Sequence, residues 1–512
     1  MLSRVYSGAI LGVKAYPVEI EVDTGSGEVD FIIVGLPDAA VRESKDRVCT
    51  AIANSGYTPP MGRTVVNLAP ADIKKEGPRF DLPIALAMLD ATGALHGSTK
   101  MPESAMIGEL ALSGEVRRVR GVLPVALAMR ELGMRRLLVP AENAEEAAVV
   151  EGIDIIPIRN LQQAADFLTG TIQIDPMRVD MSTLCANAHE GEGDFIDVRG
   201  QESAKRAIEV AVAGGHNILM IGPPGTGKTM LARRLSSILP EMTLNEALET
   251  TQIHSIAGTL PPHHALILQR PFRAPHHTIS DAGLLGGGTH PMPGEVSLAH
   301  NGVLFLDELP EFHRNVLEVL RQPLEDGFVT ISRASGTVSF PSRFILVAAM
   351  NPCPCGYYGD PRRTCNCGPA RVQSYRNRIS GPLLDRIDIH VPVAAVRYQD
   401  MQGKTTGMDS ATMRSAAQEA RKRQLHRFQK GGNPSLTCNA AMGAREINLY
   451  CNLTEPAQAL LRMAMAEMSL SARAYSRIVK VARTIADLEG EDAISDVHIG
   501  EAIQYRQLDR GL

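Results

Sequence analysis

The spacing of hydrophobic residues divides the chain into regions of different character. Short apolar runs alternate with helical periodicity over residues 1–172 and again over 195–396, whereas the periodicity is helical throughout 436–512. Two polar stretches, 173–194 and 397–435, separate these regions, and the second contains one basic helical segment. We therefore predict an α+β domain, a linker, an α/β domain with a parallel sheet, a connector and a C-terminal helical domain.

Individual elements follow from the same patterns. In the first region we expect strands at Val18–Val22, Phe31–Val34, Thr64–Leu68 and Arg136–Val139 and helices at Leu82–Leu95 and Leu123–Leu132. In the last region we expect helices at Ala457–Met468 and Ala472–Leu488.

A glycine-rich loop lies between an apolar strand pattern at Asn217–Ile221 and a helical pattern at Met230–Leu239. It fits the phosphate-binding spelling G-x-x-x-x-G-K-[ST], with the residues Gly222, Pro223, Pro224, Gly225, Thr226, Gly227, Lys228 and Thr229. The glycines let backbone N–H groups close around phosphate oxygens. Lys228 would reach the β- and γ-phosphates, and the Thr229 hydroxyl would bind Mg²⁺. A structural glycine turn is the alternative interpretation.

Two further apolar runs end in polar residues, as the other strands of an ATPase sheet do. Gly302–Glu308 ends in Asp307, which would complete the Mg²⁺ shell, and Glu308, which would polarise the attacking water. Phe344–Asn351 ends in Asn351, which would orient that water, or which simply favours the turn before Pro352.

Arg386 lies in the segment Gly381–Asp388. An arginine supplied by a neighbouring subunit can neutralise charge in the transition state of phosphoryl transfer. The alternative is a salt bridge from Arg386 to Asp385 or Asp388.

Four of the eight cysteines are clustered as two pairs separated by nine residues, namely Cys353, Cys355, Cys365 and Cys367. Four thiolates can close a tetrahedral zinc site, which would be structural because no coordination position stays open. Reduced thiols in an irregular loop are the alternative. The histidines between residues 254 and 300 have no standard metal-binding spacing.

The amino-acid composition indicates an ordinary globular protein but does not identify a binding partner. The 512-residue chain is 44% hydrophobic and 21% charged, with a net charge of −5, so any nucleic-acid contact would come from local patches. No apolar run reaches the ~18 residues needed to span a membrane, and the N-terminus has no signal pattern. We therefore expect a cytoplasmic protein with reduced cysteines and no membrane partner.

Taken in order, these motifs resemble those of the Mg-chelatase-like AAA+ ATPases of the ComM/YifB, competence-related family. The resemblance extends over nearly the whole chain. It is carried by the strings Arg270–His277, Gly286–Glu295, Ser297–His300, Gly381–Asp388 and Arg477–Asp487.

The resemblance implies an ATP- and Mg²⁺-dependent motor. Asn351 would be the first sensor, Arg386 the arginine acting on the neighbouring subunit, and Arg473 the second sensor in a helical lid, with Arg477 as the alternative. An arginine acting between subunits implies a ring, most simply a hexamer. The family acts in DNA processing during natural transformation, which implies a helicase or branch-migration factor acting on single-stranded or branched DNA.

Two projecting elements are expected from the same resemblance. One is an insert in the second helix of the module, at about residues 270–297. The other is a hairpin at Gly327–Phe340, where Arg333 would contact phosphate or simply remain solvated.

The N-terminal domain resembles a Lon-type protease in the segments Val65–Asp81, Ile107–Glu115 and Leu137–Asn143. Lon-type chemistry needs a serine nucleophile with a lysine base. The corresponding positions here hold Arg79 and Leu123, so we predict a scaffold or DNA-binding role without peptidase activity.

Three groups of basic residues are candidate DNA contacts, with solvated surface as the alternative. They are Lys74, Lys75, Arg79, Arg117, Arg118 and Arg120; Arg362, Arg363, Arg371, Arg376 and Arg378, near Tyr357, Tyr358 and Tyr375; and Arg421, Lys422, Arg423, Arg427 and Lys430. Three other functional classes stay open: a chelatase subunit, a protein remodeller, and a protein that uses ATP only to assemble.

Overall fold

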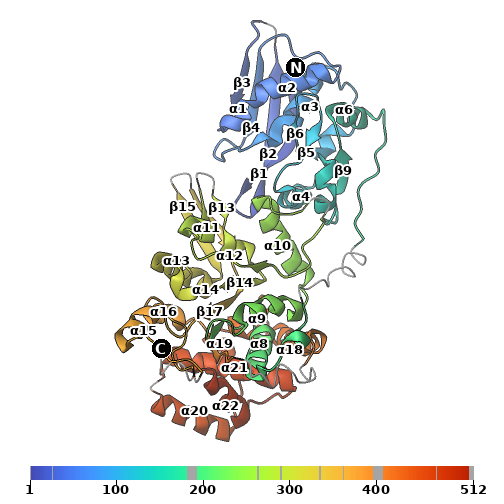
Figure 1. Cartoon of the computed structure of the whole chain (residues 1–512). Helices are drawn as coiled ribbons and strands as arrows, with labels where there is room; N and C mark the ends of the chain where they lie inside the picture. The colour runs from blue at the N-terminus through green and yellow to red at the C-terminus, as the bar shows by residue number, and fades with distance from the viewer. Residues whose placement is uncertain are drawn as a thin grey trace. The chain divides into compact units, whose positions relative to one another are not determined.

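The computed structural model contains two compact units (Figure 1). It describes residues 2–25, 27–180, 193–261, 264–288, 291–333, 336–360, 362–395, 408–468 and 470–506. The first unit comprises Met1–Ala186, Leu244–Ile267 and Ser332–Phe340, and the second comprises Asn187–Thr243, Leu268–Ile331 and Pro341–Leu512. Most of the predicted linker and part of the predicted connector lie outside the described residues.

A seven-stranded mixed sheet forms the centre of the first unit, in the order β3-β4-β2-β1-β5-β8-β9. Its strands are β1 (Leu2–Leu11), β2 (Lys14–Thr24), β3 (Phe31–Val34), β4 (Thr64–Ala69), β5 (Ser104–Met106), β8 (Arg136–Pro140) and β9 (Asp154–Ile158). β2 runs antiparallel to both β1 and β4, whereas β5, β8 and β9 run parallel. A separate two-stranded ribbon joins β6 (Glu109–Leu110) to β7 (Val116–Arg117).

Six helices from the first part of the chain belong to this unit: α1 (Ala39–Arg42), α2 (Ser44–Asn54), α3 (Asp81–Ala91), α4 (Val122–Glu131), α5 (Ala144–Ala147) and α6 (Leu161–Thr169). α3 is apolar on nearly every face and is buried, as expected for a helix inside a core. α10 (Leu244–Ala257) also belongs to this unit, although it falls within the region predicted to be the ATPase domain. Its Ser255 hydroxyl donates to the Glu146 carboxylate.

The second unit is built on a five-stranded sheet in the order β11-β14-β17-β10-β18. The strands are β10 (Ile218–Ile221), β11 (Phe272–Arg273), β14 (Val303–Leu306), β17 (Ile345–Met350) and β18 (Ile389–Pro392), and every pair is parallel. Their carboxyl ends therefore share one edge, the place where ligands bind in open parallel sheets. The β11 pairing puts the start of the predicted 270–297 insert inside this sheet.

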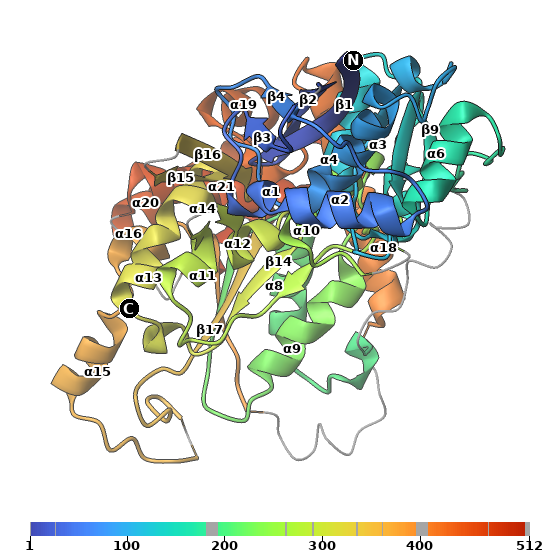
Figure 2. The same ribbon diagram turned by 90° about the horizontal axis from the view of Figure 1, so that it is seen from above.

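Short elements connect the strands of the second unit. They include α9 (Lys228–Arg234), α11 (Asp281–Leu285), the ribbon β12 (Gly286–Gly287)–β13 (Met292–Pro293), α12 (Glu295–Leu298), α13 (Arg314–Val319), α14 (Arg321–Asp326), α15 (Pro369–Arg376) and α16 (Gly381–Leu384). Figures 1 and 2 show α9 next to the strands of the sheet. β15 (Phe328–Arg333) pairs with β16 (Gly336–Pro341) as the predicted hairpin, whose turn lies outside the described residues.

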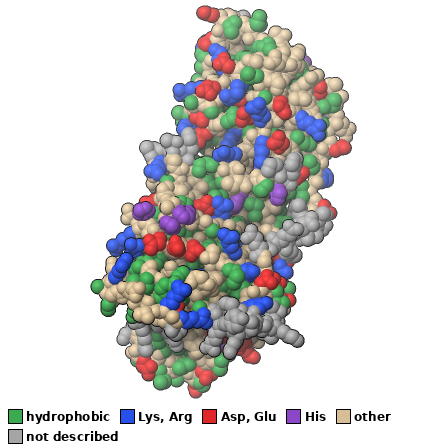
Figure 3. Space-filling model, in the orientation of Figure 1, with side chains coloured by type: hydrophobic (Ala, Val, Ile, Leu, Met, Phe, Trp, Pro, Cys, Tyr) green, Lys and Arg blue, Asp and Glu red, His purple; other side chains and the backbone are tan. Residues whose placement is uncertain are grey.

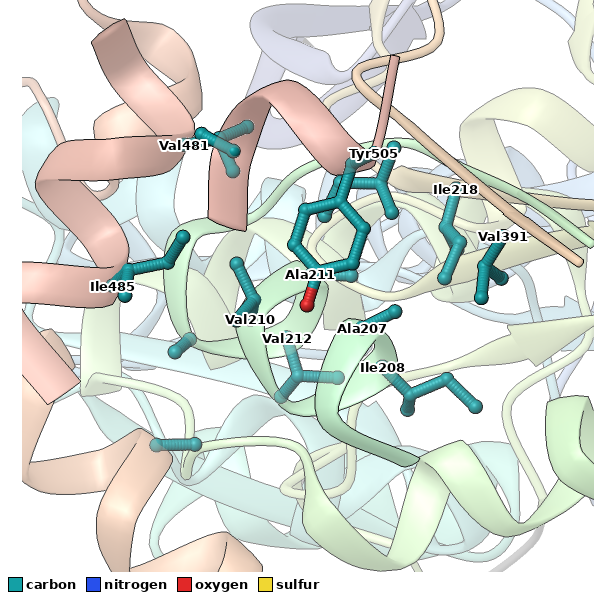
Figure 4. Packing of buried hydrophobic residues seen from close by; sticks show 14 of the residues in the cluster. Ala207, Ile208, Val210, Ala211, Val212, Ile218, Val391, Val481, Ile485 and Tyr505 are labelled. Atoms are coloured by element: carbon teal, nitrogen blue, oxygen red, sulfur yellow. The ribbon is translucent and has the colours of Figure 1, made fainter. Parts of the chain in front are cut away.

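Helices from distant parts of the chain share one core in the second unit. Figure 4 shows Val210 and Val212 of α8 (Glu202–Gly214) among residues of β10, β18 and α21 (Ala472–Glu489). α18 (Ser410–Lys430) contributes Ala417 and Phe428 to the same core. The remaining helices are α19 (Ala444–Tyr450), α20 (Glu455–Glu467) and α22 (Asp496–Gln504).

Most predicted elements are confirmed, because each has a strong local pattern. The strand predicted at Phe31–Val34 is β3, and the helix predicted at Ala472–Leu488 is α21. The helix predicted at Leu82–Leu95 is shorter, because α3 ends at Ala91 and the chain then turns at Gly93 with a φ of 87°. The predicted basic helix is α18, which is buried along one face and is part of a core as well as a connection.

Candidate functional site

The glycine-rich loop joins β10 to α9 and wraps around the start of that helix. An added Cβ at Gly222 would lie 2.1 Å from the Val393 carbonyl oxygen, so a larger residue would displace the backbone. Gly225 and Gly227 have φ values of 78° and 86°, which glycine adopts without strain. The loop therefore takes the open, left-handed path that directs successive N–H groups toward a bound anion.

Lys228 is held at the centre of this loop. Its ammonium donates to the carbonyl oxygens of Gly222, at 2.7 Å, and Pro223, at 2.9 Å. It also donates to Asn351 Oδ1 at 3.2 Å. Burial lowers the pKa of the Lys228 ammonium, while Asp307 and Glu308 act in the opposite direction. The cation is thus tethered where a phosphate of a bound nucleotide would meet it.

Thr229 and Asp307 meet across the sheet edge although 78 residues separate them. The Thr229 hydroxyl donates to Asp307 Oδ2 at 2.7 Å. One hydroxyl and one carboxylate in contact are a suitable pair of oxygen ligands for Mg²⁺. Glu308 follows with a left-handed backbone, at a φ of 51° and a ψ of 48°, and with its side chain half exposed. This backbone directs Glu308 away from the β14 core.

A histidine that the sequence interpretation left without a role lies beside Glu308. His277 follows β11, the strand next to β14, and its Nδ1 lies 3.9 Å from Glu308 Oε2. The His277 ring lies tilted against that of His276 and meets Phe312 edge-on, with ring centroids 4.1 and 6.3 Å away. The sequence did not indicate this contact, because it depends on the order of strands in the sheet. That order brings the ends of β11 and β14 to the same edge.

Arg386 makes neither of the salt bridges considered from sequence. Its guanidinium contacts the carboxylate of Glu325 and donates to the Pro382 carbonyl oxygen at 2.7 Å. The arginine is largely buried, and this burial, with Arg321, Arg473 and Arg477 nearby, lowers its pKa. Among the described residues, no contact joins Arg386 to Lys228, Asp307 or Glu308 of its own chain.

Asp388, two residues on, is bound to a different set of partners. Arg477 donates to Asp388 Oδ1 at 3.0 Å, and His216 Nδ1 lies 3.3 Å from Oδ2. Burial acts to raise the pKa of Asp388, but His216 and Arg477 outweigh it and hold the pKa below its usual range. Arg477 is therefore committed to an internal network, whereas Arg473, one turn earlier, is exposed. This difference favours Arg473 over Arg477 as the second sensor.

The four clustered cysteines approach one another closely, and their sulfur atoms all lie within 4.8 Å of one another. Cys353 Sγ is 3.3 Å from Cys355 Sγ and 3.7 Å from Cys365 Sγ, and the Cys355–Cys365 distance is 3.5 Å. A tetrahedron with zinc–sulfur bonds of about 2.3 Å has edges of roughly 3.8 Å, so these separations fit a zinc tetrathiolate. The backbone N–H of Tyr357 helps to lower the pKa of Cys355 to about 6, whereas burial and the neighbouring thiols raise the pKa of Cys365 and Cys367.

The tyrosines and arginines near this cluster form cation–π pairs. Arg363 lies 5.0 Å from the Tyr357 ring centroid, and Arg376 lies 5.2 Å from that of Tyr358. Arg378 lies 5.9 Å from the Tyr375 ring and also pairs with Glu311 at 3.0 Å. The guanidinium groups next to Tyr357 and Tyr358 are suited to phosphate contact and base stacking, whereas Tyr375 is buried.

The Lon-like positions of the first unit hold a different chemistry. Leu123 is completely buried in α4, and its backbone N–H donates to Glu146 at 3.0 Å. Burial lowers the pKa of Arg79 to about 10, and its Nη1 is buried without a hydrogen-bond partner among the described residues. Nearby, Asp81 is buried and pairs with Arg47 at 2.8 Å. These groups include no nucleophile with an adjacent base.

Several basic residues proposed for DNA contact face the protein interior. Lys75 is completely buried and donates to the Pro70 carbonyl oxygen, so it cannot meet DNA. Arg118 donates to the Leu260 carbonyl oxygen at 2.7 Å. In α18, Arg421 donates to the Val212 and Ala213 carbonyl oxygens, and Arg427 pairs with the buried Asp487.

Other basic residues of these groups remain at the surface. Arg117, Arg120, Lys422 and Arg423 are exposed. In Figure 3, Lys and Arg are interspersed with Asp and Glu over the face shown, so this face is not uniformly basic. No helix within the described ranges is long and apolar enough to cross a membrane.

Three models of magnesium-chelatase families match different stretches of the chain. The family described as magnesium chelatase, subunit ChlI, matches residues 194–401, and its C-terminal counterpart matches 407–506. The family described as subunit ChlI of Mg-chelatase matches residues 20–143.

Individual relatives cover almost the entire chain. Competence protein ComM of Haemophilus influenzae is 45% identical over 99% of this chain and 98% of its own length. The YifB protein of Escherichia coli is 42% identical over the same shares. Lon protease 2 of Bacillus subtilis is 30% identical over 146 residues, which are 27% of this chain and 26% of that protein. The similarity to Lon is thus local, whereas the others extend from end to end.

Proposed function

Because the chain belongs to the Mg-chelatase-like AAA+ family that includes the ComM and YifB proteins, we propose that it is a ring-forming, ATP-driven DNA motor. Its output would be helicase or branch-migration activity on recombination intermediates. The name of the Haemophilus relative, a competence protein, supports natural transformation as the process in which these intermediates arise. We propose that it works in the cytoplasm.

The observation that carries the ATPase proposal is the Thr229–Asp307 contact of 2.7 Å beside a tethered Lys228. In this account the backbone of Gly222–Thr229 cradles the phosphates, and Lys228 neutralises their charge. Thr229 and Asp307 would hold Mg²⁺, which would supply positive charge to offset that of the phosphates. Glu308 accepts a proton from the attacking water, and Asn351 orients that water.

The placement of Arg386 supports a ring. An arginine that makes no described contact with the nucleotide site of its own chain can still serve the site of a neighbour. Arg386 would exchange the Glu325 carboxylate for the γ-phosphate of the adjacent subunit when the ring closes. Arg473, close enough to influence the pKa of Arg386, would assist from the helical lid as the second sensor. A closed cyclic assembly, most simply a hexamer, gives every subunit such a neighbour.

DNA is the proposed substrate of the motor. The exposed Arg363 and Arg378 and the partly buried Arg376 would grip the DNA backbone. The exposed Tyr358 ring would stack on unpaired bases. Arg333, exposed near the end of β15, is a further candidate contact. The insert and the hairpin would project toward the pore. The first unit would act as a scaffold or bind DNA and would not be a peptidase, because Arg79 and Leu123 supply neither nucleophile nor base.

The four clustered cysteines are the proposed site of a structural zinc ion. Sulfur atoms within 4.8 Å of one another, supplied by two close pairs, match the donor set and size of a tetrathiolate centre. Four protein ligands leave no open position for a substrate, so the ion would stabilise the loop.

Strand displacement tests the motor proposal. Purified full-length protein would be incubated with ATP, Mg²⁺ and a fluorescently labelled forked or three-stranded DNA, with Glu308→Gln as the inactive control. We expect ATP-dependent displacement that the variant lacks. ATP hydrolysis that occurs without displacement and is stimulated by unfolded protein would indicate a protein remodeller. Stimulation by partner chelatase subunits would indicate a role in metal insertion.

A further inference from the structure

The four cysteines belong to a structure that touches the ATP site at two points. We call the four cysteines, together with Pro354 and Gly356, the cysteine knuckle. Cys353 is completely buried, whereas the other three cysteines are partly exposed. A zinc ion at this position would lie at the base of the phosphate loop, not on a remote surface.

The first point of contact is Gly356 against the phosphate loop. Gly356 has a φ of 86°, and its N–H donates to the Cys353 carbonyl oxygen at 2.9 Å, which closes a turn between the first two thiols. A Cβ added at Gly356 would lie 2.5 Å from Pro224 Cδ and 3.0 Å from Cγ. The backbone of the knuckle therefore rests directly on the proline ring that forms one wall of the loop.

The second point of contact is through Asn351, only two residues before Cys353. Asn351 accepts a hydrogen bond from Lys228 at 3.2 Å. The preceding residue, Met350, accepts one from the Gly222 N–H at 3.2 Å. The knuckle is thus joined to the phosphate loop on one side by the end of β17 and on the other by the Gly356–Pro224 contact.

We propose that metal binding at the cysteine knuckle positions Asn351 and the Pro224 wall, so that ATP hydrolysis requires a thiolate-bound zinc ion. This inference rests on the ATPase function proposed above. Asn351 contacts the reacting water in that account, whereas the zinc ion and its cysteines act through Asn351 and are positioning groups. Metal–thiolate bonds fix the four sulfur atoms far more rigidly than weak S–H hydrogen bonds do.

The consequence concerns turnover more than binding. The N–H groups of the glycine-rich loop and Lys228 would still hold the phosphates when the knuckle is empty, because β10 and α9 anchor the loop at both ends. The water-orienting amide would lose its fixed place, and catalysis is sensitive to displacements of about 1 Å in positioned groups. A metal-free protein should bind ATP and hydrolyse it slowly.

The experiment uses the full-length protein and three variants. Cys365→Ser removes one ligand. Gly356→Ala keeps all four ligands but pushes against Pro224. Cys49→Ser removes a half-buried thiol of the first unit and is the matched control. For each variant we would measure zinc per chain by elemental mass spectrometry, ATP turnover with Mg²⁺ in excess, the Kd of a fluorescent ATP analogue, and thermal unfolding.

We expect about one zinc per chain in the wild-type protein and in Cys49→Ser. Cys365→Ser should lose the zinc and at least about tenfold in turnover, with its Kd changed less than about threefold, as expected for a lost positioning group. Gly356→Ala should keep the zinc and still lose turnover. A zinc-selective chelator should lower the ATP turnover of the wild-type protein, and added Zn²⁺ should restore that turnover.

Two results would overturn the inference: a wild-type protein without zinc, or a zinc-free Cys365→Ser variant that is folded and turns over normally. If the Cys365→Ser variant does not fold, the Gly356→Ala variant and chelation of the wild-type protein still test whether turnover depends on the zinc site. If the wild-type protein contains zinc but hydrolyses no ATP, the proposed function fails instead. The zinc measurement therefore separates the two failures.

Discussion

The Lon-like first unit and the ATPase-like second unit both resemble enzymes, but only one retains a set of reactive groups in contact. In the second unit, Lys228 donates to Asn351, and the next residue, Thr229, donates to Asp307. In the first unit, the two positions that peptidase chemistry needs hold a partly buried Arg79 and a buried Leu123. The difference teaches that similarity of sequence over a domain carries the fold, whereas chemistry depends on a few side chains.

The largest effect is expected where the second unit depends on a neighbour. Arg386→Ala should lower ATP turnover by about 10³-fold, in line with arginines supplied between subunits. Because Arg386 contacts Glu325 in its own chain, ATP binding should persist. The measurement is steady-state phosphate release, with Arg445→Ala, an exposed arginine of α19, as the matched control.

Mixing experiments sharpen the Arg386 prediction. Arg386→Ala and Glu308→Gln subunits, each inactive alone, should regain part of the activity when mixed. Some interfaces would then pair an intact Glu308 with an intact arginine. Turnover of the mixture no higher than that of either variant alone would argue against an arginine acting between subunits.

The next effect concerns Glu308 itself. Glu308→Gln should lower turnover by at least about 10²-fold, because an amide cannot accept the proton of the attacking water. The fluorescent ATP analogue should bind with an unchanged Kd. Glu467→Gln, an exposed position on α20, should keep the wild-type rate. A Glu308→Gln protein with more than half of the normal turnover would remove Glu308 from the catalytic role.

In the first unit the corresponding prediction is one of stability, not activity. Arg47→Met removes the partner of Asp81, whose side chain is 0% exposed, and should destabilise the first unit by about 3 kcal/mol. Burial already raises the pKa of Asp81 to about 6, even with Arg47 present. Thermal unfolding followed by circular dichroism would show the loss, and an unchanged midpoint would contradict the structural role of the pair.

The smallest effect is expected from substitutions at the two Lon-like positions. The wild-type protein should cleave neither casein nor short peptides above background, and Arg79→Ala should change ATP turnover less than about twofold, as for a residue outside the reacting groups. Peptide cleavage by the wild-type protein that persists through further purification would contradict the claim that the first unit lacks peptidase chemistry.

Much of the second unit's fold and candidate site could be predicted from the sequence, because the patterns that indicate them are local. The loop Gly222–Thr229 is contiguous, and β14 and β17 are apolar runs that end in the polar residues a nucleotide site needs. Each run is short, apolar and bounded by turn-forming residues, which is typical of a buried strand. The parallel sheet and its edge could therefore be predicted.

What the sequence could not indicate depends on long-range contacts. Charged residues usually lie at the surface, yet the fold buries Lys75 against a carbonyl oxygen. Arg386 meets Glu325, 61 residues away, and not its neighbours Asp385 and Asp388. His277 reaches Glu308 only because β11 and β14 are adjacent. None of these pairings leaves a pattern in the sequence.

ATP hydrolysis with and without forked DNA tests the central claim most directly. The wild-type protein would be compared with Glu308→Gln, at equal concentrations of forked DNA, duplex DNA and an unfolded protein. The account predicts turnover that forked DNA stimulates several-fold, and that the variant lacks under every condition. Turnover that responds to unfolded protein and not to DNA would contradict a DNA motor, and so would turnover that no polymer stimulates.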